Sequence, residues 1–170
     1  MAKFRLLHQL LLDQQLIQAD QVVRPISISK RDLERVHARR YHEDFSRDRL
    51  TRADQRRIGL PATTPLIQRT WLAVGGTLKT ARLALSHGLA CHLAGGTHHS
   101  HRDFGSGFCI FNDCAIAAQV LLATGEVERL MVIDLDVHQG DGTAACCCDE
   151  PRIFTLSVHA ASNFPLRKVE

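Results

Sequence analysis

Two acids and a histidine stand at alternate positions where an apolar run gives way to a glycine-flanked turn. Asp134, Asp136 and His138 follow the apolar residues 131–133 and precede Gly140. Because alternate side chains of an extended chain share a face, these three would point the same way at the end of a buried strand. Burying two carboxylates and an imidazole is costly unless something pairs with them, and a divalent metal is a suitable partner. Mixed oxygen and nitrogen ligands with one position open for water suit a catalytic zinc or iron ion.

Two other interpretations of this turn explain less. A calcium loop of the EF-hand type needs glycine at its sixth position and glutamate at its twelfth, where this chain has Gln139 and Ala145. A cluster of turn acids that bond to local backbone would explain Asp141 between its two glycines. It would not explain the two acids that precede the turn, so we favour metal binding.

A histidine pair, His98-His99, lies in a glycine-rich loop upstream. A histidine beside metal-bound water can act as a general base, and a carboxylate on its other nitrogen sets its tautomer. Asp134 and Asp141 are available for that orienting role. Cys109 as a thiol nucleophile activated by the pair is an alternative, but it leaves the Asp/His turn unexplained.

The elements that must position these residues alternate between strand and helix. We predict strands over residues 89–94, 129–135 and 153–158, with helices over 115–123 and 143–148 between them. This order is typical of parallel βαβ units, in which the carboxyl ends of all strands meet at one edge of the sheet. The histidine pair and the Asp/His turn both follow strand ends, so we expect them to meet at that edge.

The upstream part is predicted to be helical. Helices are expected over residues 4–12 and 29–40, followed by short helices and loops, and then by a long helix over 65–88. Two adjacent glycines, Gly75-Gly76, lie inside the long helix. Glycine costs roughly 1 kcal/mol against alanine in a helix, so we expect close helix packing or a kink there.

Composition narrows the class of protein. The chain has 170 residues, 45% hydrophobic and 23% charged, which suits one domain with an ordinary core. A net charge of +3 is too small to indicate nucleic-acid or membrane binding. Nine arginines against six acids over residues 31–57 are interpreted as a solvated face with mixed ion pairs, the alternative being a basic patch for an acidic partner.

The cysteines indicate a reducing, cytoplasmic setting. Three of the six are consecutive, at residues 146–148, which suits neither a disulfide framework nor the usual spacing of zinc ligands. The sequence shows no signal peptide and no apolar run long enough to span a bilayer.

Four motifs in order resemble those of the zinc-dependent histone deacetylases, most closely the class IV branch and its bacterial relatives. They are Gly95-Gly96-Thr97-His98-His99, Gly107-Phe108-Cys109-Ile110-Phe111-Asn112-Asp113, Asp134-Leu135-Asp136-Val137-His138-Gln139-Gly140-Asp141-Gly142 and Thr155-Leu156-Ser157-Val158-His159. The resemblance implies an arginase–deacetylase α/β fold, a three-layer parallel sheet with helices on both faces. It also implies hydrolysis of an acyl-lysine amide on a protein, or of an acylated small amine.

The resemblance also implies a role for each residue of the site. Asp136 and His138 would be zinc ligands, and His98 and His99 a general base/acid pair backed by Asp134 and Asp141. The resemblance implies a narrow substrate channel lined by Gly107 and Phe108. It implies a structural potassium site as well, formed by Asp134, Asp136, His138, Ser157 and Val158.

The family pattern continues beyond what this sequence contains. A further metal-binding aspartate and a carbonyl-polarising tyrosine have no counterpart, since the only tyrosine is Tyr41, far upstream. The family also begins with a strand ahead of the helix that starts here at Phe4. Residues 1–170 are therefore expected to be a single partial deacetylase catalytic domain, incomplete in its C-terminal half, poorly soluble or weakly folded, and inactive alone.

Two alternatives to an active deacetylase remain open from the sequence. One is a catalytically dead remnant or binding module that lacks the third zinc ligand and the tyrosine. The other is an arginase-like binuclear hydrolase, which would need further bridging ligands and is disfavoured by the His98-His99 pair.

Overall fold

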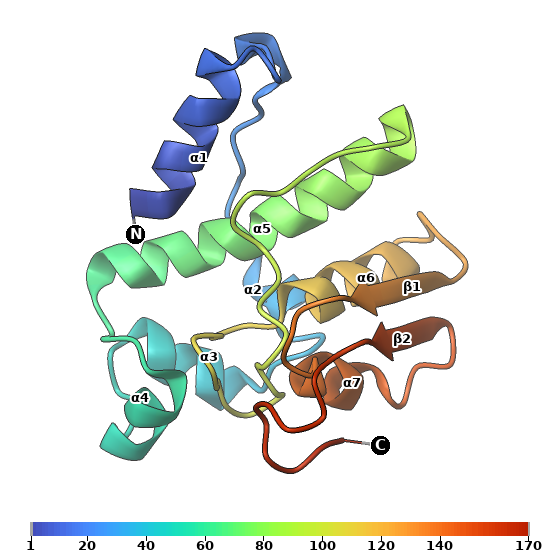
Figure 1. Ribbon diagram of the computed structural model, residues 1–170. Coiled ribbons are helices and arrows are strands. Elements are labelled where there is room, and N and C mark those ends of the chain that lie inside the picture. The colour runs from blue at the N-terminus through green and yellow to red at the C-terminus, as the bar shows by residue number, and fades with distance from the viewer. Residues whose placement is uncertain (1, 170) are drawn as a thin grey trace.

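The computed structural model describes residues 2–169, in which helices pack on one side of a two-stranded parallel sheet (Figure 1). The elements in chain order are α1 (Ala2–Asp13), η1 (Ala19–Gln21), α2 (Lys30–Leu33), α3 (Arg39–Ser46), α4 (Arg52–Ile58), α5 (Thr64–His87), α6 (Asp113–Ala123), β1 (Leu130–Asp134), α7 (Asp141–Cys147) and β2 (Ile153–Ser157).

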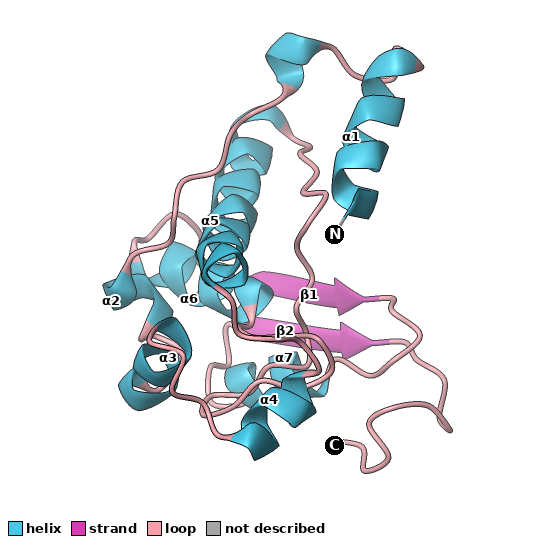
Figure 2. Ribbon diagram, turned by 90° about the vertical axis from the view of Figure 1, so that its left-hand side faces the viewer, coloured by secondary structure: helices cyan, strands magenta, loops and turns pink. Residues whose placement is uncertain are grey.

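The sheet has the parallel βαβ connection that the sequence predicts. β1 pairs with β2 in the register Leu130 to Ile153 through Asp134 to Ser157, and α7 lies on the connection between them. Figure 2 shows the two strands side by side and pointing the same way. The α/β class with parallel strands is thus confirmed, and both strands end at the edge where the predicted site residues lie.

The core lies where α5 and α6 pack against each other. Helix α6 is apolar on all sides and is buried along most of its length, and its start is capped by Asn112, whose side chain accepts the Ala115 N–H at 3.0 Å. An aromatic cluster of Tyr41, Phe45 and Phe111 fills the space below α5.

The glycine pair in α5 allows two close approaches, although not to the helix that we expected. A Cβ at Gly75 would collide with the backbone carbonyl of Ile26, and one at Gly76 would lie 2.6 Å from Nε2 of His92. The neighbours are an extended segment and a histidine rather than another helix, and α5 is continuous through both glycines.

The predicted helix over 29–40 is wrong in its second half. Helix α2 stops at Leu33 and α3 begins only at Arg39. Between them the Ala38 N–H donates to the carbonyl of Arg102 at 3.0 Å, and His37 turns into the core. In a continuous helix these backbone groups would bond within the helix. We therefore attribute the break between α2 and α3 to the tertiary contacts.

The predicted strand over 89–94 is also wrong. Within residues 2–169, β1 pairs with β2 alone, and residues 89–94 form a loop with Leu89 79% exposed. A strand needs a neighbour for its backbone groups. The segment is tied down through a side chain instead, because His92 Nδ1 contacts Thr77 Oγ1 at 2.9 Å.

The two faces of the sheet differ. Val132 and Ile153 pack with the core, whereas alternate side chains on the other face are exposed. The exposed set is Met131, Ile133, Leu135, Val137, Phe154, Leu156 and Val158. Helices are predicted on both faces of the sheet, but within residues 2–169 they cover only one face. Parallel sheets are normally buried on both faces, so we name this set the open sheet face.

We expect the open sheet face to make the isolated chain self-associate and bind a hydrophobic dye, because a contiguous apolar patch of this kind is rare on monomers. Replacing Ile133 and Leu156 together by threonine should reduce dye fluorescence and the sedimenting aggregate. Leu85→Thr, which removes an isolated exposed leucine of α5, should change neither. A chain that sediments as a monomer without binding the dye would contradict this expectation.

No helix within residues 2–169 combines the length and apolar character that crossing a membrane requires.

Candidate active site

Two histidine–carboxylate pairs lie side by side at the carboxyl end of β1. His98 Nδ1 lies 2.5 Å from Asp134 Oδ2, and His99 Nδ1 lies 2.7 Å from Asp141 Oδ1. The two imidazole rings are 3.9 Å apart between centroids. An ionised carboxylate only accepts hydrogen bonds, so each Nδ1 carries the proton and each Nε2 keeps a free lone pair. The predicted convergence of the loop and the turn is therefore present.

The loop that carries the histidine pair is held by Asp113, which sequence reasoning missed. This carboxylate is 1% exposed and accepts the backbone N–H groups of Gly96 (2.9 Å) and Thr97 (2.8 Å). Thr77 Oγ1 donates to the same carboxylate at 2.5 Å. The only signal in the sequence was an acid directly after the cap of α6, which is equally typical of a helix start.

The start of α7 supports the same loop from the other side. The Thr143 N–H donates to the carbonyl of His98 at 3.0 Å, and a Cβ at Gly142 would lie 2.7 Å from that oxygen. A glycine is therefore needed for α7 to approach the loop this closely.

Burial makes the second pair the more enclosed one. His99 and Asp141 are 4% and 6% exposed. Burial alone would raise the pKa of the Asp141 carboxyl, but hydrogen bonds from His101 and His99 outweigh it and hold that pKa well below its usual range. Asp141 therefore stays ionised and can orient an imidazole at neutral pH.

Asp136 and His138, the predicted zinc ligands, are neighbours in the turn. Asp136 Oδ1 accepts the His138 backbone N–H at 2.8 Å and contacts His138 Nδ1 at 2.9 Å. The backbone hydrogen bond is the main reason that the pKa of Asp136 is lowered. Both side chains are roughly half exposed, so Nε2 of His138 remains open for a ligand.

The donor types suit zinc, but the number falls short. Within residues 2–169, no group of three or more His, Cys, Asp or Glu side chains is arranged to hold a metal ion. Catalytic zinc sites usually have three protein ligands, so Asp136 and His138 form part of such a set.

Of the two residues predicted to line a channel, Gly107 lies beside His99. Gly107 packs on the imidazole, because a Cβ there would lie 2.7 Å from Cδ2 of His99. Phe108 has a positive φ of 65° and a side chain that is 69% exposed, and its N–H donates to the carbonyl of Ile58 at 2.8 Å. Phe164, a second residue that sequence reasoning missed, packs its ring edge-on to His99 at 4.9 Å. The only indication of Phe164 in the sequence was an aromatic residue that precedes a proline beyond the last strand.

The residues of the predicted potassium site lie on adjacent strand ends. Asp134 and Ser157 are partners in the ladder, and the Val158 N–H donates to the Asp134 carbonyl at 2.9 Å. Ser157 Oγ accepts the Gly140 N–H at 3.2 Å. Potassium binding itself stays a prediction.

The buried thiols near this site are disfavoured as nucleophiles. Burial raises the pKa of Cys109 to about 12, which disfavours the thiolate that a nucleophile needs. Burial likewise raises the pKa of Cys146 to about 12 and that of Cys147 to about 11. Tyr41 is buried and donates to the carbonyl of Ile110 at 2.7 Å, as a core residue does.

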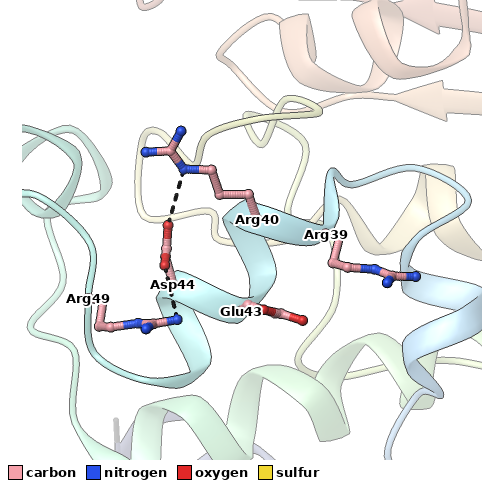
Figure 3. Close-up of a pocket in the computed structure, with 5 residues that line it drawn as sticks. All are labelled: Arg39, Arg40, Glu43, Asp44 and Arg49. Atoms are coloured by element: carbon pink, nitrogen blue, oxygen red, sulfur yellow. Dashed lines mark ion pairs between the residues drawn. The ribbon is translucent and has the colours of Figure 1, made fainter.

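The arginine-rich segment forms mixed ion pairs, as predicted. Arg40 and Arg49 reach Asp44 from two sides, at 3.6 and 3.5 Å, at a surface hollow that Arg39 and Glu43 also line (Figure 3). The ion pairs favour the solvated mixed face, while the excess of arginine leaves the alternative of a basic patch a prediction.

The fold and the site together define an α/β protein with an acid–base centre at the carboxyl edge of a parallel sheet. A family model described as the histone deacetylase domain matches residues 1–169, which include both histidine–carboxylate pairs. The chain belongs to the histone deacetylase family.

Relatives come from bacteria and plants. The chain is 52% identical over 168 residues to an uncharacterized protein of Picosynechococcus sp., covering 99% of this chain and 56% of that protein. It is 32% identical to the acetoin utilization protein AcuC of Staphylococcus aureus, covering 95% of this chain and 44% of AcuC. It is also 32% identical to histone deacetylase 2 of Arabidopsis thaliana, covering 85% of this chain and 39% of that protein.

Solved structures agree on the fold. A histone deacetylase homologue complexed with SAHA superposes with a TM-score of 0.79 at 25% identity, covering 91% of this chain and 44% of that one. The homologue from Aquifex aeolicus gives a TM-score of 0.77 at 24% identity, covering 89% and 43%. The chain thus spans about half the length of the relatives it matches.

Proposed function

We propose that the domain to which this chain contributes hydrolyses the amide of an acylated lysine, or of a similar acylated amine, with the help of zinc. The observation that carries the proposal is the double histidine–carboxylate pair, with its two Nε2 atoms free and its two Nδ1 atoms bonded to Asp134 and Asp141. Such a pair can take a proton from water and return one to a leaving amine.

Each residue of the two histidine–carboxylate pairs has a part in this proposal. His99 is the more enclosed base, because its ring is buried and its carboxylate partner stays ionised. His98 is its companion, oriented by Asp134, and it can act as an acid toward the leaving amine only after its Nε2 has taken up a proton. Both imidazoles are fixed as Nδ1–H tautomers, so each presents a lone pair where the reacting water would lie.

Asp136 and His138 would hold the zinc ion, and a further ligand would have to come from outside residues 2–169. Zinc, when bound, polarises the amide carbonyl and acidifies bound water. The partial ligand set explains why we expect the chain alone to be inactive even though its acid–base residues are in place.

The substrate class follows from the surroundings of His99. Gly107 packs on the ring with no side chain between them, Phe164 gives apolar surface beside it, and Phe108, the residue after Gly107, exposes its ring. An aliphatic lysine stem fits such a wall better than a charged substrate does. The solved homologue that was complexed with SAHA supports the same class of ligand.

The test is a chimera in which this chain is followed by the part of the Picosynechococcus protein beyond the matched segment. We expect zinc-dependent turnover of a fluorogenic acetyl-lysine peptide by the chimera and none by the chain alone. Replacing His138 by alanine in the chimera should abolish zinc retention and turnover together. A folded, zinc-loaded chimera that turns over no acylated amine would contradict the proposal.

A second candidate, a binding module without catalysis, is favoured by one observation, the two-residue ligand set. It predicts that the zinc-loaded chimera binds acyl-lysine peptide in a calorimeter but releases no product.

A further inference from the structure

His101 is a third histidine at the candidate site. Its Nε2 lies 3.1 Å from Asp141 Oδ2. The other oxygen of the same carboxylate, Oδ1, bonds to His99 Nδ1 at 2.7 Å. One buried carboxylate thus joins two imidazoles, one through each oxygen.

The ring of His101 is itself fixed. It stacks on Phe104 with centroids 4.5 Å apart and an interplanar angle of 19°. The guanidinium of Arg57, in α4, lies 4.6 Å from the centroid of that phenylalanine, within the range of a cation–π contact. The His101 backbone N–H also donates to the Phe104 carbonyl at 2.9 Å.

We propose that His101 is a positioning residue, which locks the carboxylate of Asp141 and thereby fixes His99 as the Nδ1–H tautomer. Within residues 2–169, His101 is the side chain that donates to Oδ2 of Asp141. Without it, that oxygen would be buried and unpaired, at a cost of about 1–3 kcal/mol. The carboxylate would then turn toward another donor and leave the bond to His99.

Electrostatics agrees with the geometry. Among the influences that lower the pKa of Asp141, the hydrogen bond from His101 is the largest, followed by the one from His99. The inference deepens the proposed function, because a wrong tautomer would place a proton on the Nε2 that must accept one. The inference concerns how Asp141 is bonded to the two imidazoles, and this geometry exists whether or not the chain turns over substrate.

The test reads the tautomer directly by ¹⁵N magic-angle-spinning NMR of histidine-labelled chain at neutral pH, which tolerates self-association. In the unaltered chain we expect His99 to show a protonated Nδ1 with a strongly downfield proton and an unprotonated Nε2. His101→Phe keeps an aromatic ring next to Phe104 but removes the donor to Asp141. In this variant the downfield Nδ1 proton of His99 should be lost, and the Nε2–H form of His99 should appear. His101→Gln places an amide N–H near the same point and should restore the signal.

The control is His87→Phe, at the exposed end of α5, which should leave the His99 signals unchanged. An unaltered His99 tautomer in a folded His101→Phe chain would overturn the proposal, as would loss of the signal in His87→Phe to the same extent. Because no turnover is measured, failure of the proposed hydrolysis would leave this result standing, and failure here would leave the hydrolysis proposal standing.

Discussion

Replacing His99 by alanine in the chimera is expected to lower kcat about 10²–10⁴-fold, the usual contribution of a positioned general base. The reason is local: its Nε2 carries the one buried, carboxylate-backed lone pair that we assign to proton transfer, and its partner Asp141 is held in the ionised form. Initial rates on the fluorogenic acetyl-lysine peptide, at saturating zinc, give the measurement.

A second variant separates orientation from proton transfer. Asp141→Asn keeps the shape, but its amide can donate to the imidazole and so favours the opposite tautomer, and we expect kcat to fall almost as far. Cys109→Ala is the matched control beside the same loop. Because burial keeps that thiol protonated, it should retain activity. If Cys109→Ala were inactive and His99→Ala active, the thiol interpretation would replace ours.

The alternation of Asp134, Asp136 and His138 predicts a metal-binding turn, because a strand puts alternate side chains on one face. The strand β1 ends at Asp134, so Asp136 and His138 lie in the turn beyond it, and metal binding stays a prediction. The meeting of this turn with the histidine loop was predictable too, because parallel crossovers bring strand ends to one edge. The first inference depends on a rule that holds within a few residues, and the second on a rule that holds for a whole topology.

What the sequence could not predict depends on particular tertiary contacts. Asp113 looks like an ordinary helix-start acid until the loop folds over it, and His101 looks like a solvated loop residue until Asp141 approaches. Likewise, residues 89–94 have the composition of a strand, but composition does not supply the neighbouring strand that the ladder requires. Each error arises where a distant partner decides between two locally acceptable states.

His37 makes the free energy of unfolding depend on pH in a range above that in which most carboxylates titrate. The imidazole is 1% exposed, its Nε2 accepts the Asn112 N–H at 2.9 Å, and its Nδ1 lies 3.3 Å from the Arg102 carbonyl. Burial lowers its pKa from 6.5 to about 4, although the backbone carbonyl partly offsets the effect. A proton on Nε2 would point at the Asn112 N–H, so the folded chain resists it.

The sign follows from the two pKa values. Between pH 6.5 and pH 4 the unfolded chain binds a proton at His37 that the folded chain does not, so the free energy of unfolding falls as the pH is lowered through that window. The loss should total about 3 kcal/mol, from 1.4 kcal/mol per pKa unit. His92, whose pKa burial also lowers, adds to the loss in the same direction. Asp141, with its lowered pKa, acts only below its unfolded value of 3.8.

Urea unfolding of the chain at pH 7, 6, 5 and 4 measures the loss, and the variant with Ile133 and Leu156 replaced by threonine serves as the background if association interferes. His37→Phe places an aromatic ring next to Tyr41 and Phe111, whose rings His37 contacts at 5.8 and 5.3 Å. It should be less stable at pH 7, because the Asn112 N–H loses its acceptor at a cost of about 1–3 kcal/mol. Its free energy of unfolding should nevertheless fall by about 3 kcal/mol less between pH 7 and pH 4 than that of the parent. Equal losses in the two proteins would mean that His37 takes up its proton in the folded state, which the donated N–H of Asn112 should prevent.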